Sequence, residues 1–374
     1  MGVTEQVERS LGAVIDPMTA LSISRTGILA GVRPGRDDVI VSLALPTASW
    51  PVDGLREEVL RVAQGVPGTP RAQVETSMMS AAEREVLCRV LKASMGMTDA
   101  PGGEGTAPGP AFLRPGTRTR VLGVSSGKGG VGKSSVTVNL AIALAQRGQH
   151  VAVLDADVYG FSVPKMIGSD IDPVVLGDLV VPALAHGVRW LSMGFFVADD
   201  QPVIWRGPML HKALGQFFTD TYWGTPDFLV VDMPPGTGDV ALSLAQVIPM
   251  AEVIVVTTPQ PAAQLVAQRS AYAARKLKLS VRGVVENMSW FSADDEKRYE
   301  IFGSGGGERL AAELGVPLLG QVPLVPALRE GGDTGRPVTV WDPANEASAA
   351  FATLAARITD LGPARVYKRE LLVH

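Results

Sequence analysis

Residues 127–134 read Gly127-Lys128-Gly129-Gly130-Val131-Gly132-Lys133-Ser134. The first and last glycines, the second lysine and the serine match the phosphate-binding pattern G-x-x-x-x-G-K-[S/T]. A buried-strand pattern at 121–126 comes just before the loop. A helical pattern at 134–146 follows it and ends ahead of Gly148, a residue suited to a left-handed conformation. This strand–loop–helix order predicts a nucleotide-binding α/β fold.

The loop has the chemistry of a triphosphate site. Its four glycines let backbone N–H groups converge on phosphate oxygens, and the helix that follows adds the partial positive charge of its N-terminus. We expect Lys133 to pair with the β- and γ-phosphates and the Ser134 hydroxyl to ligate Mg²⁺. All residues of 127–134, together with Ser135, are therefore predicted to contact ATP.

Three aspartates follow predicted strands. Asp155 and Asp157 lie in the sequence LDADVYG, and Asp232 ends the apolar run FLVVD. A carboxylate at a strand tip beside the phosphate loop can hold a Mg²⁺-bound water, so we assign this role to Asp232. Asp157 is the candidate for orienting or activating the attacking water. An aspartate at the end of a parallel strand can also be a helix N-cap, which is the alternative for each of them.

A segment rich in proline and glycine continues directly from Asp232. Glycines beside a γ-phosphate can offer N–H groups to it and can move when that phosphate leaves. We therefore expect a switch that senses the γ-phosphate. Its residues are Pro235, Gly236, Thr237, Gly238 and Asp239.

Lys128 is the unusual residue of the loop. Because Lys133 already neutralises the phosphates and the first turn of the loop faces outward, Lys128 has no evident task in its own subunit. A long cationic side chain there could reach the nucleotide of a second subunit, as an arginine finger does. This interpretation predicts a homodimer in which Lys128 is catalytic, together with Lys133 and Asp157. The alternative is a solvated surface lysine.

Beyond the loop, apolar runs alternate with helical stretches. Near-continuous Val, Ile and Leu runs of this kind predict a mostly parallel sheet with helices on both faces. The predicted strands are Arg120–Ser126, Val151–Asp157, Phe228–Met233, Val253–Thr258, Val281–Asn287 and Leu318–Val322.

The length of 374 residues predicts two domains, because single cores stop growing near about 250 to 300 residues. Residues 1–92 carry a strand pattern at Asp38–Leu45 and helical patterns at Leu55–Ala63 and Ala81–Leu91, which predict a small α+β domain. The Gly- and Pro-rich stretch at 98–118 predicts a linker over 93–118. The ATPase domain would then span 119–362, with a tail at 363–374.

Composition limits the partners. A net charge of −4 without a concentrated basic patch argues against binding to nucleic acid or acidic lipid. Without an apolar run of 18 residues or a signal-like N-terminus, we expect a cytoplasmic protein with no stable membrane association. Cys88 is the single cysteine, and its helical context favours an unreactive buried thiol.

With its two lysines, GKGGVGKS resembles the deviant Walker A loop of MinD, ParA and the nitrogenase iron protein. Over about residues 118–360 the chain resembles the Mrp/ApbC family of iron–sulfur cluster carriers. The segments that carry the resemblance are DADVYGFSVP at 155–164, WRGPML at 205–210, DMPPGTGDVALSLAQ at 232–246, VVENMSWF at 284–291 and IFGSGGG at 301–307. Residues 1–92 resemble the small domain that often precedes Mrp ATPases and also occurs alone in iron–sulfur assembly factors. Trp50-Pro51 stands where that domain often has Cys-Pro.

The resemblance implies a dimeric Mg·ATPase that binds iron–sulfur clusters, [4Fe-4S] among them, and transfers them to apoproteins with assembly factors as partners. It also implies an adenine site in which Asn287 bonds the base near Pro323. A turn-forming role is the alternative for Asn287. For Arg206, a place near the dimer interface and a structural ion pair stay open.

The pattern of the family breaks at one point. Many members carry Cys-x-x-Cys between the NMS and FGxGGG motifs, whereas this chain has WFSADDEKRYE, which contains no cysteine. The oxygen ligands of Asp294, Asp295 and Glu296 poorly suit a cluster, and a solvated acidic loop is the simpler interpretation. The sequence therefore identifies no cluster ligand.

Two other functions stay open at this point. One is an ATPase scaffold that recruits assembly factors through its small domain and holds no cluster. The other is a positioning ATPase like MinD or ParA, acting on membrane or DNA. Against the second, the C-terminal PARVYKRELLVH is too short for a basic amphipathic anchor.

Overall fold

The computed structural model describes residues 2–69, 71–97, 117–158, 160–196, 207–236, 239–293 and 297–363. Most of the predicted linker and the predicted tail lie outside these ranges. The chain divides into two compact units. The smaller comprises 1–114, 170–184 and 218–225, and the larger comprises 115–169, 185–217 and 226–374.

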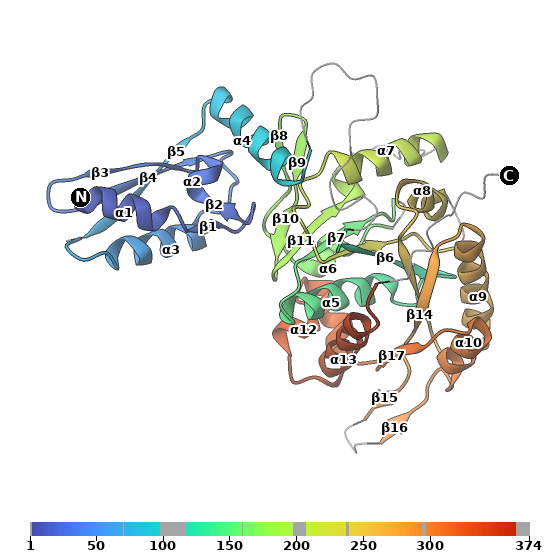
Figure 1. Ribbon diagram of the computed structural model, residues 1–374. Coiled ribbons are helices and arrows are strands. Elements are labelled where there is room, and N and C mark those ends of the chain that lie inside the picture. The colour runs from blue at the N-terminus through green and yellow to red at the C-terminus, as the bar shows by residue number, and fades with distance from the viewer. Residues whose placement is uncertain are drawn as a thin grey trace. The chain divides into compact units, whose positions relative to one another are not determined.

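The larger unit is built on a sheet that has eight strands among the described residues (Figure 1). The strand order is β10-β11-β7-β12-β6-β13-β14-β17, and every neighbouring pair from β11 to β17 is parallel. The strands are β6 Arg120–Ser126, β7 Val151–Asp155, β10 Ala183–Ala185, β11 Val188–Ser192, β12 Phe228–Asp232, β13 Glu252–Thr257, β14 Ser280–Asn287 and β17 Leu318–Val322.

Helices cover both faces of this sheet, with α5, α12 and α13 on one side and α9 and α10 on the other (Figure 1). The predicted mostly parallel sheet between helices is thereby confirmed. The helices of this part are α5 Lys133–Gln146, α6 Val163–Ile167, α7 Gly207–Thr219, α8 Asp239–Val247, α9 Pro261–Lys276, α10 Gly306–Leu314, α11 Pro326–Thr334, α12 Val338–Trp341 and α13 Glu346–Asp360. A 3₁₀ turn, η2, spans Met193–Phe196, and a short hairpin joins β15 Phe291–Ser292 to β16 Arg298–Tyr299.

The sequence located these strands closely, with one correction. β6 and β17 have the predicted bounds, and β12, β13 and β14 differ by one residue at their ends. The prediction was wrong at β7, which ends at Asp155 and not at Asp157. The backbone N–H of Asp157 donates to Asp155 Oδ1 at 3.2 Å, and this bond turns the chain out of the sheet. Gly148 has the expected left-handed conformation, with φ of 80°.

Ion pairs to the buried Glu252 close the amino ends of β6, β13 and β14. Arg120 Nη2 lies 2.6 Å from Glu252 Oε2, and Arg282 Nε lies 3.5 Å from the same oxygen. Arg120 also donates to the carbonyl of Ile358 in α13 at 2.6 Å. A buried guanidinium needs such partners, because an unpaired charge in the interior is strongly destabilising. The cluster therefore fastens α13 to the sheet end opposite the phosphate loop.

The smaller unit is α+β, as predicted. Its sheet has β4 Val39–Leu45 in the centre, antiparallel to β3 Leu29–Pro34 and parallel to β5 Ala72–Met78. The residues Val39, Val41, Leu43 and Leu45 of β4 are all buried. Their alternation marks one face of the strand as core. The helices are α1 Val3–Leu11, α2 Ile23–Thr26, α3 Asp53–Gln64 and α4 Ala81–Ser94, and β1 Ile15–Asp16 pairs with β2 Leu21–Ser22.

Asp16 organises the turn after β1. Its Oδ2 accepts from the backbone N–H and the hydroxyl of Thr19, at 2.9 and 2.7 Å. Its Oδ1 accepts from Trp50 Nε1 at 3.1 Å. Both side chains are buried, so this pair satisfies the only polar atom of the indole. Trp50 thus has a structural task in this chain.

Two later segments of the chain complete the core of the smaller unit. β8 Val174–Leu176 and β9 Leu179–Val181 form an antiparallel hairpin, and Tyr222 Oη donates to the carbonyl of Thr19 at 2.7 Å. Lys92 Nζ lies 2.7 Å from Asp178 Oδ2 in the same hairpin. The buried side chains that these segments add to the core are Val174, Leu176, Leu179, Val181 and Tyr222.

Candidate functional site

The phosphate loop joins β6 to α5 at the carboxyl edge of the sheet. Gly130 and Gly132 have φ of 80° and 77°, a left-handed conformation that disfavours any side chain. At Gly127, a Cβ atom would lie 2.2 Å from the carbonyl carbon of Val266 in α9. The backbone path thus depends on glycine at these three positions, which explains the composition of the loop.

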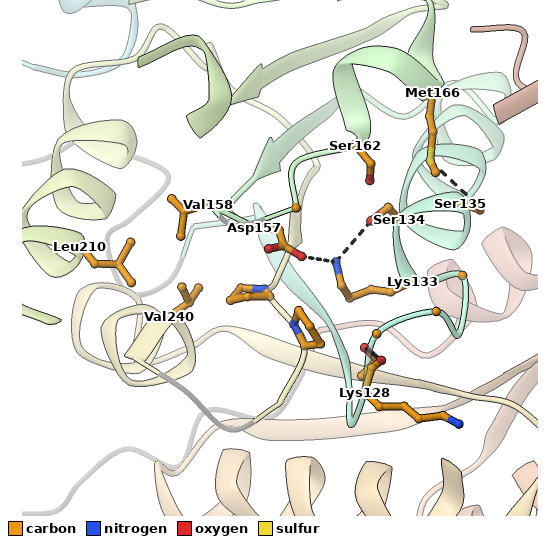
Figure 2. A pocket seen from close by; sticks show the side chains of 17 residues that line it. Lys128, Lys133, Ser134, Ser135, Asp157, Val158, Ser162, Met166, Leu210 and Val240 are labelled. Atoms are coloured by element: carbon orange, nitrogen blue, oxygen red, sulfur yellow. Dashed lines mark hydrogen bonds and ion pairs between the residues drawn. The ribbon is translucent and has the colours of Figure 1, made fainter. Parts of the chain in front are cut away.

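A cavity of about 690 Å³ opens beside the loop (Figure 2). This volume lies in the range of small-molecule sites. Its polar side consists of loop residues, Asp157 and Ser162, and its apolar side includes Val158, Leu210 and Val240. The predicted residues Gly129, Gly130, Gly132, Lys133, Ser134 and Ser135 all line it, together with Lys128. One cavity therefore gathers most of the predicted phosphate contacts.

Asp232 is the centre of a buried hydrogen-bond group at the end of β12. Its Oδ1 accepts from Lys133 Nζ at 2.7 Å and from Thr137 Oγ1 at 2.9 Å, and its Oδ2 accepts from Ser134 Oγ at 2.5 Å. Asp232 is fully buried and Lys133 is 7% exposed. The carboxylate and the serine hydroxyl, predicted together as the Mg²⁺ site, thus lie in contact.

These donors suit Mg²⁺, which binds proteins through one or two carboxylates and shares its remaining positions between water and phosphate. The residues that would hold it are Ser134 and Asp232. Among the residues that the structure describes, no group of three or more His, Cys, Asp or Glu side chains could hold a metal by itself. A magnesium ion here would therefore depend on the nucleotide for part of its coordination.

Asp157 faces the same lysine from the loop that follows β7. Its Oδ2 lies 3.8 Å from Lys133 Nζ, and the side chain lines the cavity (Figure 2). Ser162, at the end of that loop, lines the cavity as well. The Asp157 carboxylate thus lies both beside Lys133 and on the cavity.

Asp155 lies deeper, in register with Asp232 on the neighbouring strand. It is fully buried, and burial, with the negative charge of Asp232 adding to it, raises the pKa of Asp155 to about 7. The N–H bonds from Asp157 and Val163 and the charge of Lys133 oppose this rise. Asp155 therefore differs in its surroundings from Asp157 and Asp232, the two aspartates whose carboxylate oxygens face Lys133.

The predicted switch segment lies beside the cavity. Pro235 lines it, and the N–H of Gly236 donates to the carbonyl of Ser126 at 2.8 Å. The hydroxyl of Ser270 in α9 donates to the carbonyl of Gly236 at 3.2 Å. The segment is thus tied to β6 and α9. Thr237, Gly238 and the side chain of Asp239 lie outside the described residues.

Lys128 does not join the group around Asp232. Its side chain is partly exposed and extends away from Lys133 and Asp157 (Figure 2). The described part of the chain offers it no ion pair, whereas its carbonyl accepts from Ser126 Oγ at 3.0 Å. The backbone of Lys128 is therefore fixed while its ammonium group stays free to reach outward.

A second cavity, of about 190 Å³, adjoins the loop on the side of β14 and α11. Asn287 and Pro323, the two residues of the predicted adenine site, both line it, with Met166 and Gly132. Asn287 Nδ2 donates to the carbonyl of Val131 at 2.9 Å, and Asn287 Oδ1 has no hydrogen-bond partner among the described residues. A buried acceptor without a partner indicates a place for a donor from a ligand.

The sequence analysis did not predict every residue of the site, and some residues that it did predict lie outside the described ranges. Thr137 bonds Asp232, and its signal was the spacing of four residues from Lys133, which puts both on one helix face. Met166 lines both cavities from α6 and had no signal of its own. Arg206, Asp294, Asp295 and Glu296 lie outside the described residues.

Comparison with known proteins agrees with this geometry. The family model of the ParA type described as "NUBPL iron-transfer P-loop NTPase" matches residues 117–359. An iron–sulfur cluster carrier protein of Mycobacterium leprae is 44% identical over 343 residues, covering 89% of this chain and 87% of the relative. The carrier protein of the same name from Synechocystis is 38% identical, and the match covers 96% of this chain and 97% of the length of that relative.

Among solved structures, a nucleotide-binding protein of Archaeoglobus fulgidus in complex with ADP is similar with a TM-score of 0.51 and 31% identity. The match covers 59% of this chain and 88% of that one. No helix among the described residues is long and apolar enough to cross a membrane. The glycine loop, the ion pairs of Lys133 with two aspartates and the matches over most of the chain all agree. The chain belongs to the NUBPL/ParA family of iron-transfer P-loop NTPases, in its Mrp/ApbC branch.

Proposed function

We propose that the chain is a homodimeric Mg·ATPase whose nucleotide cycle drives the transfer of iron–sulfur clusters to apoproteins. The observation that carries the proposal is that Lys133, Ser134 and Asp157 line one cavity of about 690 Å³, while the buried Asp232 contacts both Lys133 and Ser134. A lysine for the phosphates, a hydroxyl and a carboxylate for Mg²⁺ and a second carboxylate for water are the parts that phosphoryl transfer requires.

In the proposed reaction, Lys133 binds the β- and γ-phosphates and the loop N–H groups surround them. Mg²⁺ supplies the positive charge that offsets charge developing on the phosphate oxygens. Asp157 orients the attacking water, and the segment around Pro235 and Gly236 senses the loss of the γ-phosphate. Lys128 extends toward a second subunit and completes that subunit's site, so hydrolysis depends on the dimer.

The cluster is the cargo of this cycle and not a resident cofactor. The relatives named as carrier proteins support this part of the proposal. The only cysteine, Cys88, is 8% exposed within the smaller unit, where its Sγ contacts Asp178 Oδ1 at 3.6 Å. A pair of such thiols in a dimer would be two short of the four thiolates that most clusters take. We therefore expect ligands from a client or a small thiol to complete the cargo site.

The burial of Cys88 also favours a second candidate function, an ATPase scaffold that holds no cluster itself. Anaerobic reconstitution with iron and sulfide, with and without ATP and glutathione, separates the two. A carrier is expected to retain about one cluster per dimer and to activate an apoprotein such as aconitase. If the chain retains no stoichiometric cluster under any of these conditions, the result contradicts the carrier function and supports the scaffold.

Turnover itself is tested by phosphate release from Mg·ATP. The wild-type chain is expected to release phosphate slowly, and chelation of Mg²⁺ is expected to stop the release, because the terminal phosphate then loses its main neutralising charge. Turnover that persists in excess EDTA would contradict the proposed site.

Asn287 is expected to select adenine over guanine. One of the two N–H groups of its Nδ2 donates to the Val131 carbonyl, and its Oδ1 is a buried acceptor without a partner among the described residues. That acceptor can accept a hydrogen bond from the amino group of adenine, whereas guanine presents a carbonyl there. Asn287→Ala should weaken ATP binding about tenfold and reduce the preference for ATP over GTP. Competition binding with both nucleotides measures this, with Ser289→Ala as a matched control because the Ser289 hydroxyl bonds the Glu286 carbonyl. An unchanged preference in Asn287→Ala would contradict the assignment.

A further inference from the structure

Asp155 is a buried carboxylate that the proposed reaction does not use. It ends β7 and is fully buried between β11 and β12, where it is paired in register with Ser192 on one side and Asp232 on the other. It does not line the cavity. Burial of a carboxylate is costly unless donors surround it, so its partners reveal what the chain gains from it.

Within the described residues those partners are all donors, and most belong to one loop. Oδ1 accepts from the N–H of Asp157 at 3.2 Å, and Oδ2 accepts from the N–H groups of Ser162 and Val163, both at 3.1 Å. A single side chain thus holds the loop between β7 and α6 at both of its ends. The α6 N-cap residue, Ser162, makes no side-chain cap bond, so Asp155 satisfies the donors at this helix start.

A fourth donor extends the anchor to β11. Ser192 Oγ donates to Asp155 Oδ2 at 3.3 Å. Ser192 Oγ in turn accepts from the N–H of Gly194 at 3.1 Å. The absence of a side chain at Gly194 matters, because a Cβ there would lie 2.7 Å from the ring of Phe161. Phe161 belongs to the same loop and directly precedes Ser162, so its ring packs closely against Gly194 at that end of the loop.

The anchored loop is the one that presents Asp157 to the cavity. Asp157, Val158 and Ser162 all line the cavity, and Asp157 Oδ2 lies 3.8 Å from Lys133 Nζ. The position of that oxygen depends on the path of the backbone around it. A displacement of about 1 Å in a reacting group can cost on the order of 10²-fold in rate.

We infer that Asp155 is the positioning residue for Asp157, fixing the 156–163 loop so that the Asp157 carboxylate meets the water at the nucleotide. This rests on the proposed function, because it assigns Asp155 a task in ATP hydrolysis. Asparagine cannot replace it, because N–H donors face both carboxylate oxygens, and the amide NH₂ would meet either the N–H of Asp157 or those of Ser162 and Val163.

The test is a double-mutant cycle between Asp155→Asn and Asp157→Asn, assayed at pH 8. Each single variant is expected to lower kcat on the order of 10²-fold and to change the Kd for ADP by less than about threefold, because Lys133, Ser134 and Asp232 are untouched. The double variant is expected to be no slower than Asp157→Asn alone. Losses that multiply in the double variant would overturn the inference, as would a large loss of ADP affinity in Asp155→Asn.

A second measurement does not depend on turnover. In Asp155→Asn, amide hydrogen exchange of peptides that cover 157–163 is expected to be at least about tenfold faster, with the phosphate loop unchanged. Ser192→Ala removes one of the four donors and should change exchange and kcat in the same direction by a smaller factor, which keeps the test available if Asp155→Asn does not fold. Unchanged exchange in both variants would refute the anchor. If the wild-type chain shows no turnover, the proposed function fails while exchange still decides the anchor.

Discussion

Lys128→Ala is expected to lower ATP turnover roughly 10³-fold, the lower end of what a finger residue contributes, while nucleotide affinity stays within about threefold. The reason is the division of labour in the loop. Lys133 lies inside the group around Asp232, whereas Lys128 points away from it and has no ion pair within the described ranges. Phosphate release and isothermal titration with ADP measure the two effects separately.

Mixing two inactive variants shows whether Lys128 acts across the dimer. In a heterodimer of Lys128→Ala and Asp157→Asn subunits, one of the two sites has both its own Asp157 and the Lys128 of the other chain. With free exchange of subunits, an equal mixture should recover about a quarter of wild-type turnover, because half of the dimers are mixed and each has one complete site. The matched control replaces the second chain by the Lys128→Ala/Asp157→Asn double variant, which cannot complete a site. No recovery in the first mixture would refute the cross-subunit role.

Lys133→Ala is expected to weaken nucleotide binding on the order of 10²- to 10³-fold, as truncation of one member of a buried charged pair typically does. The variant removes the cation that faces the phosphates and leaves Asp232 and Asp157 without the ammonium group at 2.7 and 3.8 Å. Both consequences oppose the entry of a polyanion into the cavity.

Binding of a fluorescent ATP analogue measures the loss directly. A thermal shift supplies an independent readout, since a ligand that binds only the folded state raises Tm. ADP at 1 mM should raise the Tm of the wild-type chain and leave that of Lys133→Ala unchanged. Lys276→Ala, which removes an exposed lysine at the end of α9, is the control and should respond like the wild type. Wild-type affinity in Lys133→Ala would refute the loop assignment.

The parts of this fold that sequence reasoning predicts well are those set by local chemistry. β6, the glycine loop and α5 follow from an apolar run, four glycines and a helical pattern that lie next to one another. The position of Asp232 beside the phosphate loop was predictable for the same reason. The carboxyl end of a parallel strand lies at the edge of the sheet where the loop also lies.

What could not be predicted depends on the path of the chain between elements. The sequence assigned Asp157 to the water and gave Asp155 no role, and only the tertiary fold gives Asp155 three donors from the turn at 156–163 and a fourth from Ser192. The orphaned Oδ1 of Asn287 likewise depends on which carbonyl its amide group happens to meet. Such contacts are set by the tertiary fold and leave no periodic trace in the sequence.

The discontinuous make-up of the smaller unit has a consequence for how the protein is synthesised. Its first segment leaves the ribosome early, but the side chains of Val174, Leu176, Leu179, Val181 and Tyr222, which fill part of its core, come later. At about 5 to 20 residues per second, the interval from residue 97 to residue 225 is roughly 6 to 26 s. During this time the nascent segment has an incomplete core, which makes it a natural client for chaperones at the exit tunnel.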